Sequence, residues 1–260
     1  MASLRNPLNA DAGRGEPQSQ TLNTELPMSD KPSVVLVHGA FADASGWSDV
    51  ILSLEKRGYF VTAVQNPLTS LADDVATTRR VIDTQKGPVI LVAHSYGGAV
   101  ITNAAKGAAN VKALVYVAAF APEENEAFAP LLEKYPTMLA TALVPDSAGF
   151  LSIDRTKFKE AFCADVGDDV RRVLAATQKP LHGSIFGAQF GPPAWKDIPS
   201  WFLVARHDNT INPDLERMFA KRMNATTIEL ESSHVAYISH PDVVVDLIEA
   251  AATATVTQTA

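Results

Sequence analysis

The 260-residue sequence is poor in cysteine, in basic residues and in long apolar runs, and each scarcity excludes a class of protein. Cys163 is its single cysteine, so no internal disulfide can form, and we expect a small buried hydrophobe there. The 22 basic residues are outnumbered by 29 acidic ones, which gives a net charge of −7. Without a dense lysine or arginine cluster, we expect no nucleic-acid partner. No apolar run is long enough to span a bilayer, so we expect no membrane span.

The N-terminal stretch is also poor in large apolar residues. Residues 1–31 are rich in Asn, Gln, Ser, Gly and Pro, and cannot bury enough surface to offset the entropy of the chain. We therefore expect a disordered leader, and Met28 is a candidate start besides Met1. The stretch lacks the compact apolar segment of a secretory signal, which together with the cysteine usage predicts a cytoplasmic protein.

The rest of the chain alternates short apolar runs with helical patterns. The runs are continuous and rich in β-branched residues, as in strands that are covered on both faces. The expected strands are Ser33–Val37, Tyr59–Val64, Val89–Ala93, Val111–Val117, Trp201–Ala205 and Thr226–Leu230. Helical patterns separate them, with short connections. This order predicts an α/β fold with a doubly wound, mostly parallel sheet.

One long segment interrupts this alternation. Residues 122–198 contain no clear buried strand, but helix-compatible pieces occur at 127–143, 156–164 and 168–177. A structureless loop of this length is improbable inside a compact domain. We therefore expect a helical cap at 122–198 and a core formed by residues 32–121 and 199–260. The cap should lie at the C-terminal ends of the strands, where open α/β sheets bind ligands.

The segment around Ser95 has the pattern of a nucleophile elbow. The sequence Val-Ala-His-Ser-Tyr-Gly-Gly at 92–98 follows a buried strand and opens a helix, the context in which a serine stands on a sharp turn. The turn needs small neighbours; Gly97 satisfies this, while Ala93 replaces the usual glycine and predicts slight crowding. The backbone N–H of Tyr96 would face a developing oxyanion. A simple N-cap serine is the structural alternative.

A serine nucleophile needs a base and an acid that orients the base. In a fold of this kind the acid and then the histidine follow the serine along the chain. His234, which follows the last expected strand, is the predicted base, in preference to His207 and His240. Asp208, just after the strand Trp201–Ala205, is the predicted acid. Asp214, Glu123 and Glu124 are the weaker candidates.

The loop after the first strand, His38-Gly39-Ala40-Phe41, completes the expected site. Gly39 permits a tight turn, and the backbone N–H of Ala40 is the predicted second oxyanion donor, with that of Phe41 as the alternative.

These motifs, with Trp47 and Ser233-His234, resemble the α/β-hydrolase superfamily. Within it, the chain resembles small carboxylesterases that include plant methyl-ester esterases, their hydroxynitrile-lyase relatives, and bacterial pyrethroid-hydrolase-like esterases. The resemblance covers about residues 33–252. It implies an esterase without a cofactor or metal, with a helical cap over the site.

The predicted function is therefore that of a serine carboxylesterase acting on small, largely apolar esters through an acyl-enzyme. Phe41 and the cap residues Phe128 and Phe186 are the predicted substrate contacts, and further apolar residues of the cap are candidate pocket walls: Leu131, Leu132, Phe158, Phe162 and Phe190. A hydroxynitrile lyase is disfavoured because Val235-Ala236-Tyr237, without lysine, follows the histidine. A non-hydrolytic binding protein stays open, as do amide cleavage, the natural substrate and the oligomeric state.

Overall fold

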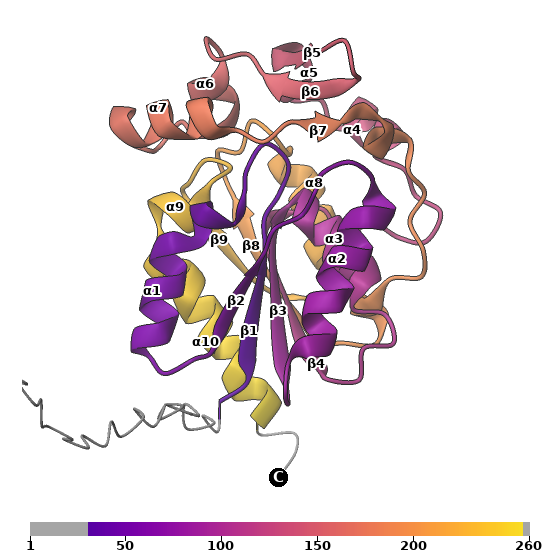
Figure 1. Ribbon diagram of the computed structural model, residues 1–260, viewed down its shortest axis with the longest axis vertical. Helices are drawn as coiled ribbons and strands as arrows, with labels where there is room; N and C mark the ends of the chain where they lie inside the picture. The colour runs from indigo at the N-terminus through magenta and orange to yellow at the C-terminus, as the bar shows by residue number, and fades with distance from the viewer. Residues whose placement is uncertain (1–30, 257–260) are drawn as a thin grey trace, which may run out of the picture.

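The computed structural model of the protein describes residues 31–256 (Figure 1). The predicted leader, except for Lys31, the candidate start at Met28 and the last four residues of the predicted core lie outside the described residues.

A six-stranded sheet forms the centre of the molecule (Figure 1). The strand order is β2-β1-β3-β4-β8-β9, and every neighbouring pair is parallel. The prediction of a parallel α/β sheet is confirmed, and the ends of the six expected strands shift by at most two residues. The strands are β1 (Ser33–Val37), β2 (Val61–Val64), β3 (Val89–Ser95), β4 (Val111–Ala119), β8 (Ser200–Ala205) and β9 (Thr226–Leu230).

Helices cover both faces of this sheet. On one face α1 (Ser48–Lys56) packs beside α10 (Pro241–Val256), and on the other α2 (Leu71–Thr84) packs beside α3 (Tyr96–Ala104) (Figure 1). Because both faces are covered, every residue of β1 and β3 is buried, which explains their unbroken apolar runs. The remaining elements of the core are η1 (Ala44–Trp47), α8 (Pro213–Arg222) and α9 (Ala236–Ser239).

The segment between β4 and β8 lies across one end of the sheet (Figure 1). Its helical elements are α4 (Phe128–Lys134), α5 (Leu139–Ala142), α6 (Phe158–Phe162), α7 (Asp168–Thr177), η2 (Gly183–Gly187) and η3 (Ala194–Lys196). The helix expected over 127–143 is broken after Lys134, because Pro136 disfavours a helical conformation at Tyr135, whose φ and ψ are −123° and 71°.

This inserted segment also contains a small sheet that the sequence analysis did not predict. β5 (Leu143–Pro145), β6 (Phe150–Ile153) and β7 (Leu181–His182) form three antiparallel strands in that order. Seven of these nine residues are exposed or half-buried, and Leu181 and Ile153 are the buried ones. Short strands with little burial carry no continuous apolar run, so their sequence resembles that of a loop.

The strand order brings two predicted loops together. The chain leaves β1 toward β2 on one side and returns to place β3 on the other side, and Val37 pairs with Ala93. The loops that follow β1 and β3 therefore emerge next to each other at the C-terminal edge of the sheet. This is the point at which doubly wound sheets form their binding crevices.

Candidate active site

Ser95 stands on a strained turn between β3 and α3. Its φ of +56° and ψ of −128° are rarely adopted by a residue other than glycine, and its neighbours must hold it there. A Cβ atom on Gly97 would lie 2.7 Å from the His38 carbonyl oxygen, and one on Gly98 would lie 2.3 Å from that of Phe120. Both positions therefore require glycine, whereas Ala93 is accommodated, fully buried, without loss of the turn.

Asp208 and His234 form a buried pair. The Asp208 Oδ2 atom lies 2.5 Å from His234 Nδ1, and neither side chain is exposed. The other oxygen, Oδ1, accepts hydrogen bonds from the backbone N–H groups of Thr210 (2.6 Å) and Ile211 (2.9 Å). The carboxylate is thus fixed on both sides, and it makes Nδ1 the protonated nitrogen of the imidazole.

The imidazole of His234 lies beside the turn that carries Ser95. His94, which directly precedes the serine, donates from Nε2 to the backbone oxygen of His234 at 2.9 Å, and the two rings are 4.5 Å apart. His234 Nε2 is buried and has no hydrogen-bond partner among the residues that the structure describes. A buried acceptor without a partner is costly, so this nitrogen is available to a hydroxyl group.

His94 is a packed histidine whose contacts reach the predicted base. Its ring lies 4.5 Å from that of Tyr237 and is fully buried, and burial lowers its pKa well below the ordinary value. A neutral His94 has one N–H group, and this group donates its hydrogen bond to the backbone oxygen of His234. It therefore supports the predicted base from the side of the elbow.

The loop after β1 is held by the side chain of His38. The backbone N–H of Asn66 donates to His38 Nε2 (3.0 Å), so Nδ1 carries the proton and donates to the Gly39 oxygen (2.8 Å). Burial lowers the pKa of His38 to about 4, which keeps this arrangement in the neutral form. Because the Gly39 carbonyl and the Ala40 N–H belong to one planar peptide, His38 orients the predicted donor.

Tyr96 is anchored through its hydroxyl group. The hydroxyl donates to Asp74 Oδ2 (2.7 Å), and the other oxygen of Asp74 accepts from the Leu68 N–H (2.8 Å). Asp74 lies in the first turn of α2, but its carboxyl group is buried, and burial raises its pKa. The contact ties the start of α3, where the Tyr96 N–H lies, to α2.

A narrow apolar cavity of about 30 Å³ adjoins Ser95. It has room for two or three water molecules, each of which needs about 10–15 Å³. The predicted contacts Phe41, Phe128 and Phe186 and the candidate wall Leu132 line it, whereas Leu131, Phe158, Phe162 and Phe190 do not. The complete lining is Ala40, Phe41, Ser95, Tyr96, Phe120, Phe128, Leu132, Leu139, Leu181, Ile185, Phe186 and Thr210.

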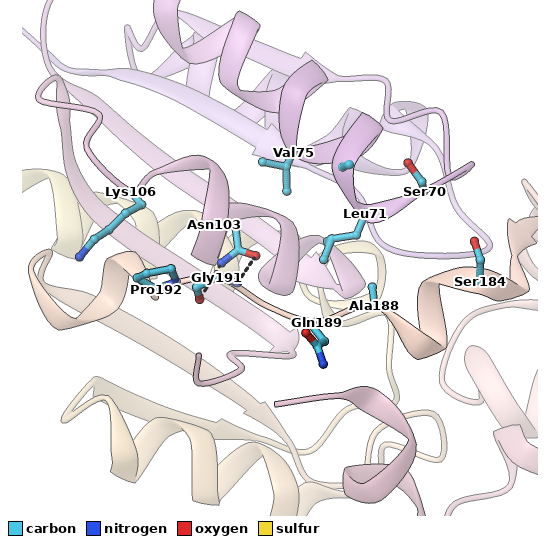
Figure 2. A pocket seen from close by; sticks show the side chains of 11 residues that line it. Ser70, Leu71, Val75, Asn103, Lys106, Ser184, Ala188, Gln189, Gly191 and Pro192 are labelled. Carbon is cyan, nitrogen blue, oxygen red and sulfur yellow. Dashed lines mark hydrogen bonds between the residues drawn. The ribbon is translucent and has the colours of Figure 1, made fainter. Parts of the chain in front are cut away.

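A wider groove of about 460 Å³ lies elsewhere, between α2, α3 and the segment that follows η2 (Figure 2). Asn103 crosses it to reach the Gly191 oxygen at 3.2 Å. None of the predicted site residues lines this groove.

The alternative bases make other contacts. His207 is exposed and lies 2.5 Å from Glu231 Oε2. His240 contacts Ser239 at the start of α10. His182 contacts Ser184 and does not line the cavity.

The alternative acids are likewise engaged away from His234. The Glu123 carboxylate forms an ion pair with Lys196 at 2.6 Å and accepts a hydrogen bond from the backbone N–H of the exposed Glu124. Asp214 pairs with Arg217 in the first turn of α8.

Three further features bear on ligands and location. Burial raises the pKa of the Cys163 thiol to about 12, as suits a packed residue. No group of three or more His, Cys, Asp or Glu side chains within residues 31–256 is arranged to hold a metal ion. No helix in the described part of the chain is long and apolar enough to cross a membrane.

A parallel, doubly wound sheet whose switch point presents a strained serine turn and an Asp–His pair defines an enzyme of the α/β-hydrolase class. The chain belongs to the alpha/beta hydrolase family, whose model matches residues 34–247. The predicted family membership is thus confirmed.

Several distant relatives match more than four-fifths of the chain. A probable hydrolase, R7, from a Phoma species is 26% identical over 84% of this chain and 97% of its own length. Methylesterase 8 of Arabidopsis thaliana is 26% identical over 83% of this chain and 88% of its own. A pyrethroid hydrolase from Sphingobium faniae superposes with a TM-score of 0.74 at 20% identity, covering 87% of this chain and 99% of that one.

Proposed function

We propose that the protein is a serine carboxylesterase that cleaves small, largely apolar esters through an acyl-enzyme. The observation that carries the proposal is the buried Asp208–His234 pair, whose imidazole packs against His94 in the strained turn of Ser95 and whose Nε2 has no partner among the described residues. Similarity to a probable hydrolase and to a methylesterase supports the same class of reaction.

In the proposed mechanism, Ser95 Oγ attacks the ester carbonyl carbon while its proton passes to His234 Nε2. Asp208 stabilises the imidazolium that forms. The N–H groups of Ala40 and Tyr96 donate to the oxyanion, which collapses as the alcohol leaves with the proton from His234. Water then attacks the acyl-enzyme by the same route, releases the carboxylic acid and restores the serine. Apo geometry often lacks the serine–histidine hydrogen bond, which tightens when substrate binds.

The cavity favours uncharged substrates. Ser95 and Thr210 are the hydroxyl-bearing residues of its lining apart from Tyr96, and the Thr210 hydroxyl is already engaged with the Ala161 oxygen at 2.6 Å. No charged side chain lines it. A cavity of about 30 Å³ cannot hold an ester, so we propose that residues 122–198 act as a cap whose side chains, Phe186 among them, move when substrate enters.

The lyase alternative has little support. Val235 and Ala236, which follow His234, are buried and apolar and offer no cation for a cyanide leaving group. Release of cyanide from mandelonitrile in a His234-dependent manner would favour that reaction over hydrolysis.

The deciding experiment compares hydrolysis of short-chain nitrophenyl esters by wild type, Ser95→Ala and the control Ser48→Ala, which alters an exposed serine of α1. We expect Ser95→Ala to lose about 10³-fold or more in kcat, while Ser48→Ala retains the wild-type rate. A fluorophosphonate probe should label the wild type and not Ser95→Ala. Undiminished hydrolysis by pure Ser95→Ala would refute the proposal, and tight ester binding without labelling of the wild type would identify a binding protein instead.

A further inference from the structure

The first turn and end of α6 contact the loop that carries the predicted acid. Asn209 Nδ2 donates to the Glu160 oxygen at 2.9 Å, and Thr210 Oγ1 donates to the Ala161 oxygen at 2.6 Å. Both residues immediately follow Asp208. A short piece of the inserted segment therefore holds the acid loop through its own backbone carbonyl groups.

The residues that follow α6 hold the loop of the predicted base. Asp165 Oδ2 accepts from the Ser233 N–H at 3.0 Å and from the Ser239 hydroxyl at 2.9 Å, and its Oδ1 accepts from the Ser233 hydroxyl. Ser233 directly precedes His234, and Ser239 ends α9, which follows it. The Asp165 carboxylate thus binds the base loop at one residue before His234 and at one residue after it in the sequence.

Asp165 binds the His234 loop beyond the point where backbone hydrogen bonds join it to the loop of Asp208. The last backbone bond between the two loops runs from the His207 N–H to the Ser232 oxygen at 3.0 Å. Beyond it, the bond from His94 to the His234 oxygen holds the base from the elbow side. Asp165 adds the bonds to Ser233 and Ser239, and the ring of Phe162 lies 5.1 Å from that of His234.

We propose that Asp165 is a positioning residue of the esterase: it clamps the His234 loop to the inserted segment so that Nδ1 keeps its bond to Asp208 while Nε2 faces Ser95. The inference rests on the proposed function, because it assigns Asp165 a role through His234 rather than through substrate. Through Asp165, the inserted segment is hydrogen-bonded to the loop that carries His234.

Other titratable groups surround the imidazole and must be distinguished from Asp165. Asp208 and His94 face it directly, and Glu216 of α8 interacts with Asp208. His240 Nδ1 lies 3.9 Å from Asp165 Oδ2. Burial alone would raise the pKa of Asp165, but hydrogen bonds from Ser233 and Ser239 hold it below its ordinary value, so this carboxylate stays ionised over a neutral assay range.

The kinetic test compares Asp165→Ala with Asp154→Ala. Asp154 is a matched control, because it is also a carboxylate of the inserted segment that accepts hydrogen bonds, but from Thr156 in its own turn. We expect kcat to fall about 10-fold to 100-fold in Asp165→Ala, with KM within about threefold, as for a displaced catalytic group. Asp154→Ala should keep the wild-type values.

The conservative variant Asp165→Asn separates position from charge. Its amide oxygen can still accept from the Ser233 N–H and the Ser239 hydroxyl, so we expect kcat to recover to within about fivefold of wild type. If Asp165→Asn is as impaired as Asp165→Ala while remaining folded, the clamp is not geometric and the inference is overturned. It is overturned equally if Asp165→Ala matches Asp154→Ala, or if its loss of kcat merely follows the fraction of folded protein.

A readout that does not depend on turnover separates this inference from the proposed function. The Nδ1 proton of His234, hydrogen-bonded to Asp208, should give a low-field proton NMR signal in Ser95→Ala and lose or shift it in Ser95→Ala/Asp165→Ala. An unshifted signal contradicts the role of Asp165. A fully active Ser95→Ala would instead refute the esterase mechanism and leave the NMR comparison valid.

Discussion

The substitution Gly39→Ala tests whether the loop after β1 supplies an oxyanion donor. A Cβ atom at this position would lie 2.6 Å from Ser95 Cβ and 3.0 Å from the His94 oxygen. Ordinary contacts between carbon atoms are about 3.5–4.0 Å, so one of the two loops must retreat by about 1 Å. Ser95 is held by the glycines at 97 and 98, which cannot yield, so the loop of Gly39 and Ala40 is the part that moves.

The expected cost follows from the role of the Ala40 N–H in the transition state. Loss of one oxyanion donor costs about 10²–10³ in kcat. The donor bonds to charge that develops only in the transition state, so KM should stay within about threefold. Overpacking of this kind costs about 1–3 kcal/mol in the free energy of unfolding, which leaves an ordinary domain folded.

The assay is steady-state hydrolysis of a nitrophenyl ester, with folding monitored by circular dichroism. Gly167→Ala is the matched control: Gly167 has a φ of −63°, and a Cβ there would meet no atom within 4 Å. It should behave as wild type. A folded Gly39→Ala enzyme with kcat within about threefold of wild type would refute the assignment of the donor.

Two further predictions concern a buried acid and the cavity wall. Glu216 is fully buried, and burial followed by the charge of Asp208 raises its pKa well above the ordinary value, so the folded protein keeps a proton that the unfolded chain releases above about pH 4.5. The free energy of unfolding should therefore fall as the pH rises above about 4.5, where the unfolded chain ionises. In urea titrations the free energy of unfolding of Glu216→Gln should rise relative to that of the wild type by at most about 1.4 kcal/mol per pH unit, and a pH-independent difference would contradict this. Phe186 is half-buried and lines the cavity. The Phe186→Ala variant should admit bulkier esters, so the ratio of kcat/KM for a branched ester to kcat/KM for an acetyl ester should rise by about 10-fold. Phe60→Ala, which alters a ring that is 57% exposed and outside the cavity lining, is the control, and an equal ratio in both variants would exclude Phe186 as a specificity residue.

The parallel sheet and the serine turn could be predicted from the sequence because the residue patterns that indicate them are local. A strand covered on both faces needs consecutive apolar residues, as in Val89-Ile90-Leu91-Val92, and a serine on a tight turn needs Gly97 two positions after it. The short strands of the inserted segment left no such signal, because solvent reaches most of their residues.

The hydrogen bonds that hold the predicted site residues in place could not be predicted in the same way. Ser233 and Asp165 are 68 positions apart, Tyr96 and Asp74 are 22 apart, and His94 and His234 are 140 apart. Polar side chains such as Asp74 and Glu216 look like ordinary first-turn carboxylates of a helix until the packing of another element buries them.

Local pattern alone therefore determined the order of strands and helices in the core, the serine turn, and the residue types available as base and acid, because backbone periodicity and glycine requirements act over a few residues. Only the tertiary structure decided which carboxylate meets His234, how small the cavity is, and which buried groups hold the loops. Those outcomes depend on distances between chain segments that no short stretch of sequence encodes, and on the loss of water that makes each buried hydrogen bond count.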